Sequence, residues 1–348
     1  MKKSRILWTV LSLVIFLVLV FLLFSCSSSE QKDPPLEQEE QGIHIGFAFD
    51  SFVVDRWLRD RDMFVYVAQQ LGATVDVQNA NGDVARQSQQ IYDFVTRGVD
   101  VIVIVAVDCF SLDEAVSHAR REGIPVIAYD RLIQSVPVDL FVSVDNELIG
   151  REMAQVLNDK MPEGGHVVMI NGPVTDSNTR HVRHGFESAL RRSIILDRIS
   201  VESWGGEYGR AAIIDLLNRF PNIDAVMCGN DILAGQVIQV LSERQLAGKI
   251  FVTGQDADLD ACQRIVEGTQ TMTVFKPIEA LASRAAEFAV RLARGEELEE
   301  VTDFMRSDVA DIPYYGLKPV TVTRENIERV IIESGFHLRE DVFRNVRE

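Results

Sequence analysis

The sequence predicts an α/β fold built from two doubly wound lobes, each with a parallel sheet. Strand-like and helix-like segments alternate from Ile43 onward with few breaks, which is typical of βαβ units. The alternation restarts after Asp145-Asn146, and 348 residues are enough for two domains with separate cores. Apolar strands also stop at polar residues, as Ile124–Tyr129 does at Asp130-Arg131. Since ligands bind beyond the carboxyl ends of strands in open parallel sheets, we expect a binding cleft there.

The first lobe is expected to contain five strands with helices between them. Two of the helices, over Val84–Thr96 and Ala115–Arg121, carry apolar residues at three- and four-residue spacing. Each is followed by a glycine, Gly98 or Gly123, where a helix C-cap belongs. The predicted strands are Ile43–Phe49, Thr74–Val77, Val101–Val105, Ile124–Tyr129 and Leu140–Val144.

The second lobe repeats the pattern. Helices are expected to begin at Glu147, Thr179, Tyr208 and Ile232. The predicted strands are His166–Ile170, Ile199–Ser203, Ala225–Cys228 and Ile250–Thr253.

The remaining segments are too short for a third domain. They are a strand at Thr271–Phe275, a long helix at Ile278–Arg294, a strand near Val320 and a helix at Arg324–Ser334. We expect them to cross back and complete both lobes, which leaves a hinge of several segments beside a cleft. The predicted lobes are therefore residues 43–144 plus 278–305, and residues 145–277 plus 306–340.

The N-terminus reads as an export signal. Basic residues precede the apolar stretch Ile6–Phe24, and Leu23–Cys26 resembles a bacterial lipobox. We therefore expect a lipoprotein signal peptide at 1–25, lipidation of Cys26 and a flexible stalk at 26–42, which is polar and Glu-rich. An uncleaved membrane helix is the alternative, because the apolar run approaches the ~20 residues that a span requires. Either reading places the globular part on the periplasmic side of the envelope, tethered to a membrane.

Composition excludes some partners. A net charge of −17 and a pI near 4.8 argue against nucleic acid, which needs a basic surface. Three cysteines remain after Cys26, and they could form one disulfide plus a free thiol; we expect Cys109, Cys228 and Cys262 to be unpaired.

No metal or other cofactor is expected. Carboxylates from Asp256 to Glu267 are spaced as in a calcium loop, but Ala261 stands where the turn needs glycine and the apolar residues trace a helix. His181 and His184 lie three residues apart on a predicted helix, where a solvated face explains them better than a metal site.

Five segments of the chain carry a resemblance to a known family: Asp55–Asp62, Ala128–Arg131, Ser143–Glu147, Gly254–Asp258 and Gly268–Pro277. In the same order they resemble the ribose/galactose-type family of periplasmic sugar-binding proteins of bacterial ABC transporters, in particular its D-xylose-binding members. The similarity runs from about Ile43 to the Gly335–His337 stretch. The resemblance implies two Rossmann-like lobes joined by a three-segment hinge, the periplasmic-binding-protein type I fold, closing on one sugar.

The resemblance also implies the sugar contacts, carried over position by position. Arginine stands at 59 where the family has lysine, tyrosine stands at 208 where it has tryptophan, and an extra residue near Pro173–Asp176 bears on the placement of Asn178. These differences bear on the preference for a pentose. With two aromatic residues that could cover a ring face, the expected substrate-binding set is Arg56, Trp57, Arg59, Asp130, Arg131, Asn178, Tyr208, Asn230, Asp256 and Lys276.

Local sequence patterns are also compatible with purely structural roles for the same residues. Arg56 and Arg59 stand among aspartates and could form a solvated salt-bridge ladder. Trp57 could be a core residue and Lys276 an exposed lysine. Asn230 and Asp256 could simply cap the helices that follow them.

Three functions compete. The first is a non-enzymatic receptor, expected to be a monomer, that closes on a monosaccharide (D-xylose first) and delivers it to a membrane permease, with a chemoreceptor as a second candidate partner. Another pentose or a hexose (ribose, glucose or galactose) is the alternative ligand. The second is an enzyme using Asp130 and Asp256, but no catalytic motif supports it. The third is a transcription regulator, which would need a DNA-reading segment where the export signal stands.

Overall fold

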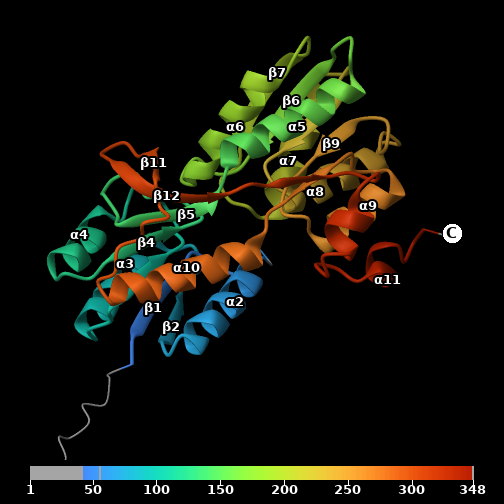
Figure 1. The fold of residues 1–348 in the computed structure, drawn as a ribbon. Helices are drawn as coiled ribbons and strands as arrows, with labels where there is room; N and C mark the ends of the chain where they lie inside the picture. The colour runs from blue at the N-terminus through green and yellow to red at the C-terminus, as the bar shows by residue number, and fades with distance from the viewer. Residues whose placement is uncertain (1–41, 55, 347–348) are drawn as a thin grey trace, which may run out of the picture. The chain divides into compact units, whose positions relative to one another are not determined.

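The computed structural model describes residues 42–54 and 56–346 (Figure 1). The predicted signal peptide, Cys26 and the predicted stalk up to residue 41 lie outside the described residues. Over the two described ranges, no helix has the length and apolar character needed to cross a membrane.

The first lobe is built on a seven-stranded sheet in the order β11-β12-β5-β4-β3-β1-β2. All neighbours pair in parallel except β11 and β12, which are antiparallel. The strands are β1 His44–Phe49, β2 Thr74–Asn79, β3 Val101–Ile104, β4 Val126–Tyr129, β5 Leu140–Val144, β11 Asp303–Arg306 and β12 Asp311–Leu317.

The second lobe is built on a four-stranded parallel sheet in the order β7-β6-β8-β9. An antiparallel pair, β10 with β13, continues it through a bridge between Thr253 and Met272. The strands are β6 His166–Asn171, β7 Ile194–Ser200, β8 Ala225–Cys228, β9 Phe251–Thr253, β10 Thr273–Phe275 and β13 Val320–Val322.

Helices connect the parallel strands of both sheets. A π-helical turn at Glu328–Ile332 stands where the sequence predicted a helix over Arg324–Ser334. The α-helices are α2 Arg56–Gln70, α3 Val84–Thr96, α4 Asp113–Arg121, α5 Asn146–Lys160, α6 Ser177–Ala189, α7 Gly206–Arg219, α8 Asp231–Glu243, α9 Leu259–Glu267, α10 Ile278–Ala293 and α11 Arg339–Val342.

The alternating side chains of β3 show why the first sheet is covered on both faces. Val101 and Val103 are buried in one apolar cluster, with residues of α2 and α10. Ile102 and Ile104 are buried in another, with residues of α3 and α4. A short strand with every side chain buried needs helices on both faces, which is the doubly wound arrangement that the sequence predicted.

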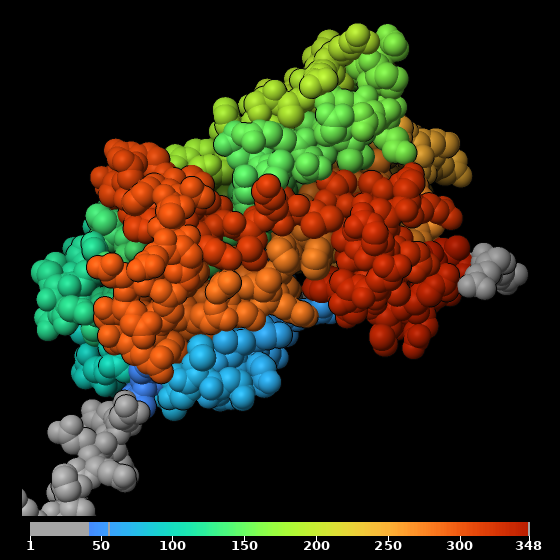
Figure 2. All heavy atoms as spheres, viewed as in Figure 1, coloured from blue at the N-terminus to red at the C-terminus, as the bar shows by residue number. Residues whose placement is uncertain are grey.

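Within the described residues, the chain crosses between the lobes three times. The crossings follow β5 at Asp145, β10 at Lys276-Pro277 and β12 at residues 318–319. The first and third crossings are hydrogen-bonded to each other, because the backbone N–H of Asp145 donates to the carbonyl of Leu317 at 2.9 Å. In Figure 2 the orange and red segments, from about residue 278 on, extend over both lobes. The predicted three-segment hinge is present.

The structure differs from the predicted lobe boundaries at one point. The strand Asp311–Leu317, assigned from sequence to the second lobe, pairs with β5 in the first sheet. The chain therefore leaves the first lobe after Leu317 and not after residue 305. Neither β11 nor β12 was predicted, because β11 is mostly exposed and β12, which lies between β11 and β5, contains Pro313 and Gly316, residues that are unusual inside a sheet.

Candidate functional site

One buried pocket collects residues that follow strands of both sheets. From the first lobe come the segment before α2, the first turn of α2 and the residues after β4, and from the second come residues after β6, β7, β8, β9 and β10. This is the convergence at strand ends that the sequence predicted. The lining residues are Val54, Arg56, Trp57, Asp130, Arg131, Asp176, Asn178, Trp204, Asn230, Gln255, Asp256 and Lys276.

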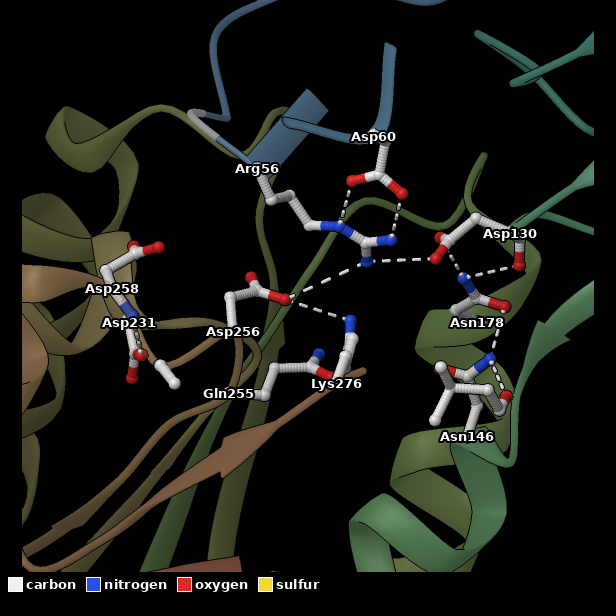
Figure 3. Close-up of polar contacts among 12 residues, drawn as sticks. Arg56, Asp60, Asp130, Asn146, Asn178, Asp231, Gln255, Asp256, Asp258 and Lys276 are labelled. Carbon is white, nitrogen blue, oxygen red and sulfur yellow. Dashed lines mark hydrogen bonds and ion pairs between the residues drawn. The ribbon is translucent and has the colours of Figure 1, made fainter. Parts of the chain in front are cut away.

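Arg56, the first residue of α2, is held by three carboxylates (Figure 3). Its Nε and Nη2 donate to Asp60 at 3.3 and 3.2 Å, one helical turn along. Its Nη1 lies 2.9 Å from Asp130 Oδ2 and 4.0 Å from Asp256 Oδ1, which belongs to the second lobe. Burial disfavours the charge, but Asp130, Asp60 and Asp256 outweigh it and raise the pKa of Arg56 well above its usual value. Arg56 is therefore a fixed cation reaching across the cleft.

Asp130 and Asp256 present carboxylates from opposite lobes. Lys276 Nζ lies 3.0 Å from Asp256 Oδ1, and both side chains are buried. Burial opposes ionisation of Asp130, but Arg56, Lys276 and Arg131 together lower its pKa. Asp130 has φ 64° and Asp256 has φ 103°, conformations that non-glycine residues seldom adopt. Strained backbone of this kind gathers at functional sites.

Arg131 forms a second charged group in the pocket. Its Nη1 donates to Asp50 at 2.7 Å and to the carbonyl of Ala106 at 2.8 Å. Its Nε lies 2.8 Å from Asp176 Oδ2, which belongs to the second lobe. Burial disfavours the charge, yet Asp176 and Asp50 raise the pKa of Arg131. A second buried arginine thus also connects the lobes.

A chain of amides links the pocket to the hinge. Asn178 Nδ2 donates to Asp130, to Oδ1 at 3.0 Å and to the carbonyl at 3.1 Å. Asn146 Nδ2 in turn donates to Asn178 Oδ1 at 2.9 Å and to the carbonyl of Val144 at 3.0 Å. Asn146 follows the first crossing, so two side chains connect Asp130 to the hinge by hydrogen bonds (Figure 3).

Two tryptophans border the pocket. The guanidinium of Arg56 lies 4.3 Å from the centre of the Trp57 ring, and Trp57 Nε1 is buried with no hydrogen-bond partner among the described residues. Trp204 Nε1 donates to Asp176 at 3.2 Å. The Trp204 ring packs on Gly172, where a Cβ would come within 2.1 Å of it, so only glycine fits there. Gln255 Oε1 is also buried and unpartnered within the described residues. The pocket therefore offers an unused donor and an unused acceptor.

The structure brings eight of the ten predicted site residues into this pocket. Their local alternatives are settled in part: Arg56 and Lys276 are about 95% buried rather than solvated, and Trp57 is both a core residue and part of the lining. Asn230 caps α8, accepting from Leu233 N at 2.9 Å, and lines the pocket as well. Asp256 does not cap α9, whose N-cap is Asp258.

Arg59 and Tyr208 do not line the pocket. Arg59 is exposed; its Nη1 donates to the carbonyl of Phe336 at 3.0 Å, and its guanidinium lies 4.4 Å from the Phe336 ring centre. Tyr208, in the first turn of α7, is partly buried against an apolar cluster of the second lobe.

Four lining residues were missing from the predicted set: Val54, Asp176, Trp204 and Gln255. Gln255 follows an apolar strand, so the rule that selected Asp256 could have selected it too. Trp204 was not selected because the family's tryptophan position was assigned to Tyr208, four residues further along the chain.

The three cysteines of the described part are unpaired and buried, as expected. Burial raises the pKa of the Cys109 thiol to about 12. The segment compared with a calcium loop forms helix α9 over Leu259–Glu267. No group of three metal-binding side chains occurs among residues 42–54 and 56–346.

Comparisons with known proteins agree with the fold. Residues 45–297 match the model of the periplasmic binding protein domain. The chain is 39% identical over 339 residues to the D-xylose-binding periplasmic protein of Haemophilus influenzae, covering 95% of this chain and 98% of that protein. It is 40% identical over 307 residues to the D-xylose-binding periplasmic protein of Escherichia coli, covering 86% and 92%.

A solved structure shows the same architecture. The carbohydrate transporter solute binding protein of Chloroflexus aurantiacus, in complex with D-glucose, superposes with a TM-score of 0.79 at 25% identity, covering 85% of this chain and 97% of that one. Since the family model spans the greater part of both lobes and the sequence matches run nearly from end to end, the chain belongs to the periplasmic binding protein family, in its ribose/galactose-type branch.

Proposed function

We propose that this protein is the sugar-binding receptor of an ABC importer. It binds a monosaccharide between its lobes and delivers it, by lobe closure, to the membrane permease. The observation that carries this is the buried pocket in which Arg56 and Asp130 of one lobe meet Asp256 and Lys276 at the edge of the other.

The chemistry of the pocket suits a polyhydroxylated ring. Each sugar hydroxyl donates and accepts, so it can be bound between a guanidinium and a carboxylate, as between Arg56 and Asp130. Charged partners make such hydrogen bonds shorter and stronger than neutral ones. The unpartnered Trp57 Nε1 and Gln255 Oε1 supply a further donor and acceptor. A hydroxyl in the wrong position leaves buried groups unpaired, at a cost of roughly 1–3 kcal/mol each, so the pocket selects among epimers.

Lobe closure gives the receptor its signal. In the structure the lobes touch through Arg131 and Asp176, through Asn178 and Asp130, and through the N–H of Cys109, which donates to the carbonyl of Thr175 at 3.0 Å. A sugar that contacts both lobes stabilises this arrangement by its differential affinity for the closed state. The permease then recognises the closed arrangement, and no chemical step on the sugar is needed.

D-xylose is the first candidate ligand. The relatives from Haemophilus influenzae and Escherichia coli are D-xylose-binding proteins, and both match most of this chain. The two positions that depart from the xylose-binding pattern, Arg59 and Tyr208, lie outside the pocket lining, so they do not argue against a pentose. Ribose, glucose and galactose are the alternatives, and a chemoreceptor is a second candidate partner.

We also propose that the receptor is a monomer, anchored to a membrane by a lipid on Cys26. The support is the order of the N-terminal sequence: basic residues, an apolar run and then Leu23–Cys26. A lipid anchor would keep the two lobes close to the permease.

Calorimetric titration with D-xylose, ribose, arabinose, glucose and galactose tests the proposal. We expect D-xylose to bind and to be recovered unchanged by NMR. Arg131→Ala should weaken binding by at least tenfold, because charged hydrogen bonds contribute roughly 1.5–3 kcal/mol. Arg121→Ala, at the exposed end of α4, is the matched control and should bind like the wild type. Turnover of a sugar would contradict the receptor, and wild-type affinity in Arg131→Ala would contradict the site.

A further inference from the structure

A buried carboxylate that lies outside the pocket lining joins the segments that supply the second-lobe part of the pocket. Asp231, the first residue of α8, is 1% exposed and follows Asn230. Its Oδ1 accepts from Gln270 Nε2 at 2.8 Å. Its Oδ2 accepts from Thr273 Oγ1 at 2.7 Å and from the N–H of Asp258 at 3.2 Å. Figure 3 shows Asp231 and Asp258 together, apart from the group formed by Arg56, Asp256 and Lys276.

These contacts reach three parts of the pocket wall. The Asp231 backbone continues from Asn230, and its N–H donates to the carbonyl of Gln255 at 3.0 Å. The N–H of Asp258 ends the loop that begins with Gln255 and Asp256. Thr273 opens β10, the strand that leads to Lys276. The carboxylate is therefore hydrogen-bonded within two or three residues of three lining residues, Gln255, Asp256 and Lys276. A fourth, Asn230, directly precedes Asp231 in the chain.

The loop that Asp231 supports is strained and closely packed. Asp256 and Ala257 have φ values of 103° and 55°, which only external contacts can maintain in non-glycine residues. Thr273 Oγ1 accepts from the N–H of Ala257 at 3.2 Å while it donates to Asp231. At Gly254 a Cβ would lie 2.1 Å from Asp231 Oδ1, so the carboxylate lies directly against the loop backbone.

The neighbours of Asp231 demand an acceptor. Gln270 Nε2, Thr273 Oγ1 and the N–H of Asp258 all donate to its two oxygens. An ionised carboxylate accepts all three, whereas a protonated carboxyl or an amide brings a donor of its own and must break at least one bond.

We propose that Asp231, which lines no part of the pocket, is a positioning residue for sugar binding whose ionised carboxylate holds Asn230, the Gln255–Asp258 loop and the start of β10 in binding geometry. This inference rests on the proposed function, because it concerns the affinity of the same pocket. The sugar is held by the lining residues, and Asp231 sets where they stand.

The charges around Asp231 make its ionisation adjustable. Burial raises the pKa of Asp231 to about 7; Arg264 and the hydrogen bond from Thr273 lower it, and the charge of Asp256 raises it. The other titratable groups facing it are Asp258, which donates its N–H, and the Cys228 and Cys262 thiols. Burial raises the pKa of both thiols, so they stay neutral from pH 6 to 8.

The direction of the pH effect follows from lobe closure. In the closed arrangement Arg56 lies within 4.0 Å of Asp256 and offsets the negative charge of Asp256. Because that charge disfavours ionisation of Asp231, closure should favour the ionised form of Asp231 and release its proton. Sugar affinity should be highest above pH 7 and fall as the pH drops below it. For unfolding the sign is opposite, because an acid whose pKa is raised in the fold stabilises it most below about pH 4, and that contribution is lost as the pH rises to about 7.

The test compares four proteins: the wild type, Asp231→Asn, the double variant Asp231→Asn with Gln270→Glu, and Asp224→Asn. In the double variant the new amide at position 231 donates to the new carboxylate at position 270, which still accepts from Arg264 Nε, as Gln270 does at 2.9 Å. Asp224, exposed before β8, is the control for the same substitution in the same lobe. Titration with D-xylose and the other four sugars gives affinities from pH 6 to 8. Amide hydrogen exchange over residues 254–260 is measured without ligand.

At pH 8 we expect Asp231→Asn to bind sugar at least tenfold more weakly and to exchange these amides faster, with thermal unfolding still cooperative. The sugar affinity of Asp231→Asn should not change between pH 6 and 8. The affinity of the wild type should fall as the pH drops from 8 to 6 and approach that of Asp231→Asn. The sugar affinity of the double variant should recover to within threefold of the wild-type value. Asp224→Asn should have the wild-type affinity.

Three results would overturn the inference. They are wild-type affinity and amide protection in Asp231→Asn, a folded double variant that recovers neither property, and a wild type whose affinity and amide protection factors, corrected for the intrinsic pH dependence of exchange, are the same at pH 6 and 8. The last needs no variant, so the proposal stays testable if Asp231→Asn fails to fold. If no sugar binds the wild type, the proposed function fails, and the exchange experiment still decides the role of Asp231.

Discussion

Arg56 and Arg59 lie one turn apart on α2, and each reaches a group in the second lobe, but their surroundings differ. Arg56 is 5% exposed and contacts Asp60, Asp130 and Asp256. Arg59 is exposed and contacts the carbonyl and the ring of Phe336. The first crosses the cleft in its interior, and the second crosses at its outer edge. Burial and the number of charged partners, more than the crossing itself, should decide how strongly each contact favours closure.

The comparison predicts its largest effect at Arg56. Arg56→Ala leaves three buried carboxylates without their shared cation, and removing one partner of a buried ion pair costs roughly 3–5 kcal/mol. We expect sugar affinity to fall by more than a hundredfold in calorimetric titration. Circular dichroism should show that the fold is retained. A loss below tenfold would mean that Arg56 serves the core of the first lobe and not the ligand.

A smaller effect on sugar affinity is expected at Asp60, which orients Arg56. Asp60 does not line the pocket. It accepts two hydrogen bonds from Arg56 and a third from the Tyr129 hydroxyl. Asp60→Asn keeps the shape but replaces one acceptor oxygen by a donor, so Arg56 loses its fixed orientation. A lost charged hydrogen bond costs roughly 1.5–3 kcal/mol, and part of this should appear as about a tenfold loss of sugar affinity.

Asp62→Asn is the control for Asp60, since Asp62 lies on the same helix and its side chain is 67% exposed. It should bind sugar like the wild type. Equal losses in the two variants would show that the helix, and not the orientation of Arg56, is responsible.

The smallest effect is expected at Arg59. Exposed contacts of this kind contribute roughly 0–1 kcal/mol, so Arg59→Ala should weaken sugar binding by no more than about fivefold. Because the contact with Phe336 joins the lobes, the change should appear as faster sugar release in stopped-flow measurements, with little change in the association rate. An effect as large as that of Arg56→Ala would place Arg59 in the binding site after all.

The strand ends show what the sequence could predict. Asp130-Arg131, Asn230 and Asp256 each follow a buried parallel strand, and the carboxyl ends of such strands meet at one edge of a sheet. Their convergence therefore follows from the pattern alone. Which residue of α2 faces the cleft does not follow in the same way, because Arg56 and Arg59 are both compatible with one face of a helix.

The spacing of apolar residues on α2 distinguishes the two arginines. The buried positions Trp57, Asp60, Phe64 and Ala68 follow helical spacing, and three of the four are apolar. An aspartate on an apolar stripe needs a buried partner, and Arg56 is one turn away. The sequence thus predicts a buried Arg56–Asp60 pair, which distinguishes Arg56 from Arg59. Contacts that depend on loop geometry, such as Trp204 on Gly172, carry no comparable pattern.

The pairing of β5 with β12 has a consequence for synthesis. Phe141 lies opposite Tyr314, so one side of the first sheet, beyond β5, is completed by residues that come late in the chain. Until those residues are available, β5 presents an open edge with unpaired backbone groups, and such edges invite pairing with other molecules. A product truncated before Asp311 should therefore aggregate and not accumulate as a folded, shortened receptor. Long-range pairing of this kind also makes folding slow, since distant segments must meet first.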